Sequence, residues 1–244
     1  MKNILFIIDN NIQYERIKAL IKSKNRRDVK YDFRHSALKS DIWEHEDFIN
    51  SGSPIIDVNN ETEFIIRNFE LVISVHCFQF FPKELINNVR CINIHPGFNP
   101  TNRGWYPQVF SIIDNLPIGA TIHEMDHKLD HGPIIARKRV DKFIWDTSFS
   151  IYERVLLTEI ELFSEFFDRI INNDYSLISP ENEGNIFYKE DFIELCKIDL
   201  NQSGTFGQFY DRLRALSHTP YKNAYFIDKE TGKKIFLRLD IEHE

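Results

Sequence analysis

The sequence predicts an α/β fold with a mixed, mainly parallel β-sheet, and three observations support this class. Short apolar runs alternate with segments whose apolar residues recur every three or four positions, as in buried strands and amphipathic helices. Residues 3–8 and 70–75 are too apolar for strands with one exposed face, and suit a parallel sheet covered on both faces. Polar side chains follow directly on apolar runs, which is where α/β enzymes place their sites.

The first half of the chain is predicted to form a Rossmann-like series of strands and helices. The expected strands are 3–8, 28–33, 70–75 and 90–95, and the expected helices are 12–22, 61–69 and 83–88. The first helix should face the core with Ile12, Ile17, Leu20 and Ile21. No Gly-x-Gly-x-x-Gly follows the first strand, so a nicotinamide dinucleotide site is not expected. Residues 37–60 are polar and form either a surface loop or a segment reaching over the site.

The second half is predicted to add two antiparallel strands, a long helix, shorter helices and a terminal β-hairpin. The expected strands are 118–125 and 134–140, the helices are 106–114, 149–171, 190–196 and 206–216, and the hairpin strands are 224–227 and 234–241. Asp146, Thr147 or Ser148 can cap the long helix. Its broad apolar face, expected to pack on the sheet, consists of Val155, Leu156, Ile160, Phe163, Phe166, Phe167 and Ile170.

A polar connection at 172–185 marks the expected end of a core domain, because it contains Pro180 and Gly184 and no apolar periodicity. We therefore expect a core of residues 1–180 and a C-terminal part, 181–244, with small helices and the hairpin. A two-stranded hairpin is marginal by itself in water, and this one is strongly apolar. We expect it to dock on a second subunit and so form a homodimer.

Composition and charge exclude several classes of function. The 244 residues carry a net charge of −7, which disfavours a nucleic-acid partner because such proteins normally have a basic surface. The three cysteines, Cys77, Cys91 and Cys196, lack disulfide or metal spacing, which favours a reducing cytoplasmic location. No stretch is long and apolar enough to predict a membrane span.

The candidate catalytic residues are Asn93, His95 and Asp130. Asn93 and His95 lie two positions apart on a predicted strand, so their side chains should point to the same side. A carboxylate at Asp130 can orient His95 and favour its charged form, while Asn93 can donate a hydrogen bond to an oxyanion. The three suit direct acyl transfer to an amine without a nucleophilic Ser or Cys. The alternative is that Asn93 caps a turn and His95 is a structural histidine.

This region resembles the folate-dependent formyltransferases. That family carries Asn-x-His-Pro after one strand and a later His, six residues, Asp-x-Gly-Pro-Ile. The matching residues here are Asn93, His95, Pro96, His123, Asp130, Gly132, Pro133 and Ile134. Residues 99–110 resemble the version found in sugar N-formyltransferases, and residues 212–225 resemble a segment that sugar and methionyl-tRNA formyltransferases share. The order of elements fits from residue 2 to about residue 143.

The resemblance implies N10-formyltetrahydrofolate as the formyl donor. The family binds its pterin ring between the loop after the third long strand and the loop before Gly132. The implied donor-binding residues are Phe78, Phe80, Phe81, Pro82, His123, Asp126 and His127. The phenylalanines serve equally well as core residues. Histidine and aspartate also bind metals, but their spacing matches no known metal motif, so no metal is expected.

The resemblance implies a dTDP-linked amino sugar as acceptor, with dTDP-4-amino-4,6-dideoxyglucose expected, for O-antigen or other surface polysaccharide synthesis. The implied acceptor-binding residues are Asn99, Asn102, Arg103, Trp105, Tyr106, Tyr221 and Lys222. The planar guanidinium of Arg103 matches the oxygens of a diphosphate, although an ordinary surface arginine is the alternative. The missing glycine loop argues against glycinamide ribonucleotide, and chain length and acidity argue against tRNA.

Three other functions stay open on sequence grounds. The acceptor amine can sit on carbon 3 of the sugar instead of carbon 4, or on another nucleotide sugar. Water can replace the amine, which would make the protein a folate-dependent hydrolase. A non-catalytic module that binds sugar nucleotides is the third alternative, although such a module has no need of Asn93, His95 and Asp130 together.

Overall fold

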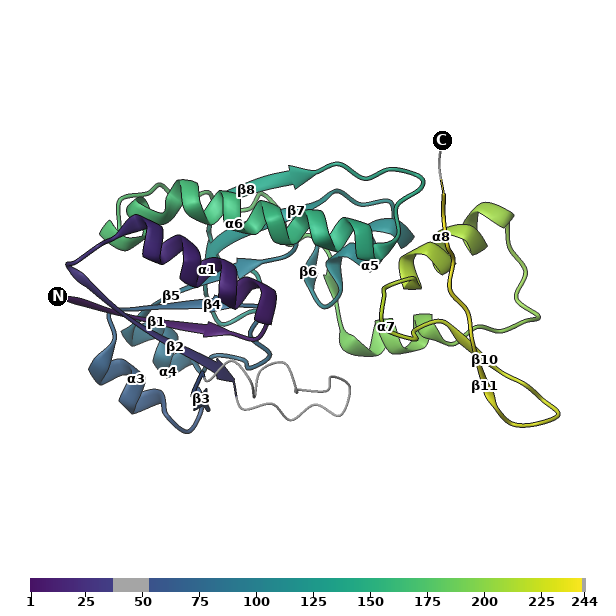
Figure 1. Ribbon diagram of the computed structural model, residues 1–244, viewed down its shortest axis with the longest axis horizontal. Coiled ribbons are helices and arrows are strands. Elements are labelled where there is room, and N and C mark those ends of the chain that lie inside the picture. The colour runs from purple at the N-terminus through teal and green to yellow at the C-terminus, as the bar shows by residue number, and fades with distance from the viewer. Residues whose placement is uncertain (37–52, 243–244) are drawn as a thin grey trace. The chain divides into compact units, whose positions relative to one another are not determined.

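A seven-stranded mixed β-sheet organises the fold in the computed structural model, which describes residues 1–36 and 53–242 (Figure 1). The strand order is β3-β2-β1-β4-β5-β7-β8. The strands are β1 Lys2–Ile8, β2 Val29–Ser36, β3 Ile55–Ile56, β4 Leu71–Val75, β5 Arg90–His95, β7 Ile118–Glu124 and β8 Ile134–Val140. Neighbours from β3 to β5 run parallel, and β7 runs antiparallel to β5. The predicted α/β class with a mixed, mainly parallel sheet is confirmed.

The β7 and β8 strands run antiparallel, as the sequence predicted. The Glu124 N–H donates to the carbonyl of Pro133 at 2.9 Å. Five residues earlier on β7, Gly119 lies against Lys138, where a Cβ would come within 2.1 Å of the carbonyl oxygen. Residues later in β8 therefore lie beside residues earlier in β7, which defines an antiparallel pair. This pair brings the loop 125–133 back to the end of β5.

The described residues form two compact units. The first unit comprises Met1–His95, Thr121–Arg137 and Glu159–Glu181, and the second comprises Pro96–Ala120, Lys138–Thr158 and Asn182–Glu244. The α6 helix (Ser148–Asn172) contributes residues to both.

In the first unit, helices cover both faces of the sheet, which explains why the parallel strands are almost wholly apolar. The other helices of this unit are α1 Asn11–Lys24, α3 Thr62–Asn68 and α4 Lys83–Asn88. Leu5 and Ile7 of β1 pack with Ile65 of α3 and Leu85 of α4. The intervening Phe6 points to the opposite face and meets Phe163 of α6 edge-on.

One expectation for the first helix is wrong, because Ile12 is 54% exposed. The neighbouring Gln13 is fully buried instead. Its amide donates to the carboxylate of Glu159, which is itself fully buried. A buried polar pair therefore occupies the position that an apolar residue was expected to fill.

The second unit has its own apolar core. Its elements are β6 Arg103–Gly104, α5 Pro107–Ile113, β9 Ile186–Phe187, α7 Lys189–Cys196, α8 Phe206–Leu216, β10 Tyr225–Ile227 and β11 Lys234–Phe236. Val109 and Ile112 of α5 pack with Ala215 and Leu216 of α8. The terminal hairpin of β10 and β11 is confirmed, but β11 ends at Phe236 instead of 241. The Leu237 N–H still donates to the Ala224 carbonyl at 2.9 Å, and the chain then turns away, with the Leu239 N–H donating to the Ser217 hydroxyl at 2.8 Å.

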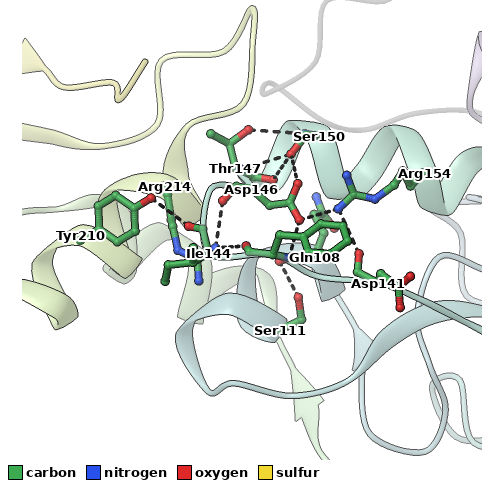
Figure 2. A network of polar contacts seen from close by, with 11 residues as sticks. Gln108, Ser111, Asp141, Ile144, Asp146, Thr147, Ser150, Arg154, Tyr210 and Arg214 are labelled. Carbon is green, nitrogen blue, oxygen red and sulfur yellow. Dashed lines mark hydrogen bonds and ion pairs between the residues drawn. The ribbon is translucent and has the colours of Figure 1, made fainter. Parts of the chain in front are cut away.

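A buried polar network joins α8 to the turn that begins α6 (Figure 2). Arg214, 5% exposed, donates to the carbonyls of Phe143 at 3.2 Å and Asp146 at 2.9 Å. The Asp146 carboxylate accepts from the Phe143 N–H at 2.7 Å and from Arg154 at 2.5 Å. The Ser150 hydroxyl donates to it as well, at 2.8 Å. The network therefore fixes the first turn of the long helix.

Replacing Asp146 with asparagine should lower the free energy of unfolding by about 1–2 kcal/mol, because it removes the charge that pairs with Arg154 and one of the two acceptor oxygens. Burial alone would raise the pKa of Asp146, but the hydrogen bonds from Arg154, Phe143 and Ser150 outweigh burial and lower it. This stabilisation is present above the ordinary Asp pKa of about 3.9 and is lost as the pH falls through the lower folded value. Urea unfolding at pH 7 and at acidic pH measures both effects, with the exposed Asp141→Asn as control.

The predicted loop at 37–60 lies mostly outside the described residues, which resume at Ser53. Across the two described ranges, no helix combines the length and the apolar character needed to cross a membrane.

Candidate active site

Three neighbouring strands of the first unit place polar side chains in one row. Ser74 of β4 pairs with Asn93 of β5, which pairs with His123 of β7. Residues that are paired across strands point to the same face of the sheet. His95, two positions after Asn93, points to this face as well, as predicted. The row lies at the carboxyl end of the parallel strands, where α/β folds form their sites.

Asp130 completes this group from the loop after β7. Its carboxylate accepts a hydrogen bond from the Asn93 amide at 2.9 Å, and its other oxygen lies 3.4 Å from Nδ1 of His95. The φ angle of Asp130 is 46°, in the left-handed region that non-glycine residues rarely adopt. Gly132 helps to hold this loop, because a Cβ there would come within 1.9 Å of the Glu124 carbonyl. The structure thus brings the three predicted catalytic residues together.

Asp130 determines which way the Asn93 amide points. A carboxylate only accepts, so the nitrogen of the amide must face Asp130, to which it donates at 2.9 Å. Nδ2 of Asn93 also lies 3.4 Å from Nε2 of His123. Nδ1 of His123 lies 2.8 Å from the Glu124 carbonyl, which holds the ring in place. The long contact to His123 leaves one N–H that can turn toward a bound oxygen.

A small cavity lies beside this row. Its polar floor is formed by Ser74, Asn93, His123 and Asp130, and its apolar wall by Phe80, Phe81, Ile86, Met125 and Leu129. Among the predicted donor-binding residues, Phe80, Phe81, His123 and Asp126 line it. Phe78, Pro82 and His127 are not among its described lining residues. Phe81 is 1% exposed and belongs to the core of β1, β4 and α4, so it also serves as a core residue.

The loop 76–81, which provides part of the cavity wall, is held by residues that sequence reasoning missed. The Asp9 carboxylate, at the end of β1, accepts from the Phe78 N–H at 2.8 Å and from the Ser36 N–H at 2.7 Å. Nε2 of His76 lies 2.9 and 3.1 Å from the two carboxylate oxygens of Glu159. Glu159 did leave a signal, because it interrupts the apolar face of its helix four residues after Val155.

The predicted acceptor residues lie in the second unit. Asn99, Asn102 and Arg103 are at most 5% exposed. Tyr106 caps α5 with a φ of 52° and stacks on Phe192 at 3.9 Å between ring centroids. Tyr221, 39% exposed, and the exposed Lys222 follow the turn after α8. The structure thus groups residues 99–106, and a role in binding stays a prediction for all of these residues.

His218, three residues before Tyr221, should make stability depend on pH. Burial lowers the pKa of His218 to about 4, so the folded protein holds a neutral ring. The unfolded chain binds this proton at a pKa of about 6.5. The folded protein is therefore most stable, as far as His218 is concerned, above pH 6.5, and this stability decreases as the pH falls from 6.5 to about 4. We expect His218→Phe to flatten the dependence of the melting temperature on pH between 6.5 and 4, and His127→Gln, at an exposed site, to leave it unchanged.

The acidic and histidine side chains of the 123–131 loop separate into two groups. Asp126 pairs with Nδ1 of His131 at 2.6 Å, whereas Asp130 faces Asn93, His95 and His123. Among residues 1–36 and 53–242, no group of three or more His, Cys, Asp or Glu side chains is arranged to hold a metal ion.

Comparison with known proteins adds independent findings. The family model "Formyl transferase" matches residues 14–167, and the model "N-formyltransferase dimerization C-terminal domain" matches residues 191–243. A dTDP-4-amino-4,6-dideoxyglucose formyltransferase from Mycobacterium bovis is 51% identical over 193 residues, which cover 79% of this chain and 82% of that protein. A solved sugar N-formyltransferase from a Shewanella species has a TM-score of 0.94 and 40% identity, covering 100% of this chain and 99% of its own. A 4-N formyltransferase from Francisella tularensis has a TM-score of 0.91 and 42% identity with the same coverage.

Proposed function

This chain belongs to the formyl transferase family, and from that premise we propose that it transfers a formyl group from N10-formyltetrahydrofolate to a dTDP-linked amino sugar. The observation that carries the proposal is the cluster of Asn93, His95 and Asp130, assembled beside a cavity from strand β5 and the loop after β7. The relative from Mycobacterium bovis supports dTDP-4-amino-4,6-dideoxyglucose as acceptor, and the 4-N enzyme from Francisella tularensis supports an amine on carbon 4.

In the proposed reaction, the sugar amine attacks the formyl carbon, and the carbonyl oxygen gains negative charge as the carbon becomes tetrahedral. Asn93 and the charged His95 donate hydrogen bonds to this oxygen. Asp130 orients His95, stabilises its charge and accepts the amine proton, directly or through water. The bond from the formyl carbon to N10 then breaks, N10 takes up a proton, and the products are tetrahydrofolate and the formamido sugar.

The cysteines support direct transfer without a thioester. Burial raises the pKa of Cys91 and of Cys196 to about 12. Burial also raises the pKa of Cys77 well above its usual range. All three therefore stay protonated at neutral pH, and a thiol is a poor nucleophile. Their free state also agrees with a reducing cytoplasm, where we place the enzyme.

We infer that the functional protein is a homodimer joined through the terminal hairpin. The match of residues 191–243 to a dimerization domain supports association of this part of the chain. Ile227, Ile235 and Phe236 of β10 and β11 are 40–50% exposed, which suits a contact with a second copy. The proposed enzyme has a catalytic core of residues 1–180 and a C-terminal part of residues 181–244. Its proposed role is in surface polysaccharide synthesis.

A formyl-transfer assay tests the function. Release of tetrahydrofolate from N10-formyltetrahydrofolate is followed with dTDP-4-amino-4,6-dideoxyglucose, with its 3-amino counterpart, and without acceptor. We expect turnover with the 4-amino sugar alone. Turnover only with the 3-amino sugar would keep the chemistry and change the acceptor, whereas equal release in all three reactions would identify a hydrolase. Absence of turnover with both sugars would contradict the proposal.

A further inference from the structure

The guanidinium of Arg103 is buried without the hydrogen bonds that buried cations usually have. The residue is 5% exposed. Its Nε and Nη1 atoms are inaccessible to solvent and have no hydrogen-bond partner among the described residues. Nη1 forms an ion pair with Oε2 of Glu183 at 3.6 Å, a distance that is too long for a hydrogen bond. Leaving such donors unpaired is costly, so this group suits an anionic ligand.

The backbone around Arg103 is fixed from a distant part of the chain. The β6 strand pairs with β9, and the Arg103 N–H donates to the Asn185 carbonyl at 3.1 Å. Gly184 makes this approach possible, because a Cβ there would come within 1.9 Å of the Pro100 carbonyl. Residues 182–188, which we call the strap, therefore hold Arg103 in place and bring Glu183 beside it.

Glu183 is weakly held in comparison with Arg103. Its side chain is 63% exposed, whereas the side chain of Arg103 is 7% exposed. An ion pair with one partner this exposed and this distant contributes little, because solvent screens the charges. A phosphate group, in contrast, can accept two short, parallel hydrogen bonds from a guanidinium. An anion with that geometry would compete successfully with the carboxylate for Arg103.

We propose that Glu183 is the counter-anion of Arg103 in the free protein and that the diphosphate of the acceptor nucleotide displaces it. Glu183 thereby becomes a residue that sets nucleotide affinity without belonging to the reaction chemistry. This inference rests on the proposed function, because it takes the nucleotide diphosphate of the acceptor as the displacing ligand. The carboxylate keeps the buried cation paired while the site is empty, at the expense of weaker nucleotide binding.

Calorimetric titration with dTDP tests this role in the full-length chain. Glu183→Gln removes the competing charge, so we expect the dissociation constant to fall about two- to fivefold, the equivalent of one exposed ion pair. Glu181→Gln, two residues earlier and also exposed, removes the same charge and should leave the constant unchanged. Arg103→Gln should raise it more than tenfold. The melting temperature of each variant is measured by thermal unfolding. A value close to that of the parent chain confirms that the variant is folded.

Two results would overturn the inference. Equal or weaker dTDP binding by Glu183→Gln, with binding still lost in Arg103→Gln, would show that Glu183 does not compete with the ligand. Unchanged binding by Arg103→Gln would show that the nucleotide does not use this cation at all. Neither result bears on formyl transfer itself, which the acceptor assay tests separately.

Discussion

Asn93→Ala should reduce kcat/KM for formyl transfer by about 100- to 1,000-fold, the usual cost of losing an oxyanion donor. The Asn93 amide lies between Asp130 and His123, and alanine removes the N–H that can reach the formyl oxygen. The loss should appear mainly in kcat, because the hydrogen bond strengthens as the oxygen becomes charged. Steady-state kinetics with saturating N10-formyltetrahydrofolate and the 4-amino sugar measure the effect.

The matched control for this variant is Asn59→Ala, which removes an exposed amide from the first unit. It should retain the activity of the parent enzyme. Thermal unfolding should show that Asn93→Ala is folded at the assay temperature. Turnover of folded Asn93→Ala within threefold of the parent value would contradict the role of Asn93.

Asp130→Asn should lower kcat by about 100- to 10,000-fold, the range for loss of a positioned acid–base group. Asparagine fits the site because it tolerates the left-handed backbone of Asp130, where φ is 46°, so the change isolates charge from fold. The amide cannot stabilise a charged His95 or accept the amine proton as a carboxylate does. An alanine variant would add backbone strain and would be harder to interpret.

The pH dependence of kcat distinguishes this role from a purely structural one. The parent enzyme should lose activity at acidic pH as the catalytic group is protonated, and Asp130→Asn should lack that limb of the profile. Asp126→Asn is the control, because Asp126 lies in the same loop and pairs with His131 instead of His95. A residual rate in Asp130→Asn that keeps the parent pH profile would show that Asp130 does not handle the proton.

Patterns with a regular period were predictable from the sequence. Asn93 and His95 were placed on one side of a strand because side chains alternate, and the register with β4 and β7 agrees. The helices at 83–88 and 206–216 were also predicted to the residue. In these cases the local sequence and the tertiary environment favour the same structure.

Features that depend on distant contacts were not predictable. The two-residue strands β6 and β9 have no periodicity of their own and exist because they pair with each other. Gln13 is buried and Ile12 is exposed because the Gln13 amide donates to Glu159, a residue far along the chain. The phenylalanines after β4 look alike in sequence, yet Phe81 is 1% exposed and Phe80 is 54% exposed. Their separate roles depend on the packing of α4.

The pairing of Arg103 with Ile186 has a consequence for the order of events during synthesis. These partners are 83 positions apart, so the ribosome has long released Arg103 before the strap emerges. Closing a loop of that length carries an entropic cost that grows with the logarithm of its length. Strands β1, β2, β4 and β5 can pair with one another during this interval, because all four have been made once His95 is added. The nascent chain can therefore assemble β5 early, and Arg103 reaches its final conformation only when residues 182–188 have emerged.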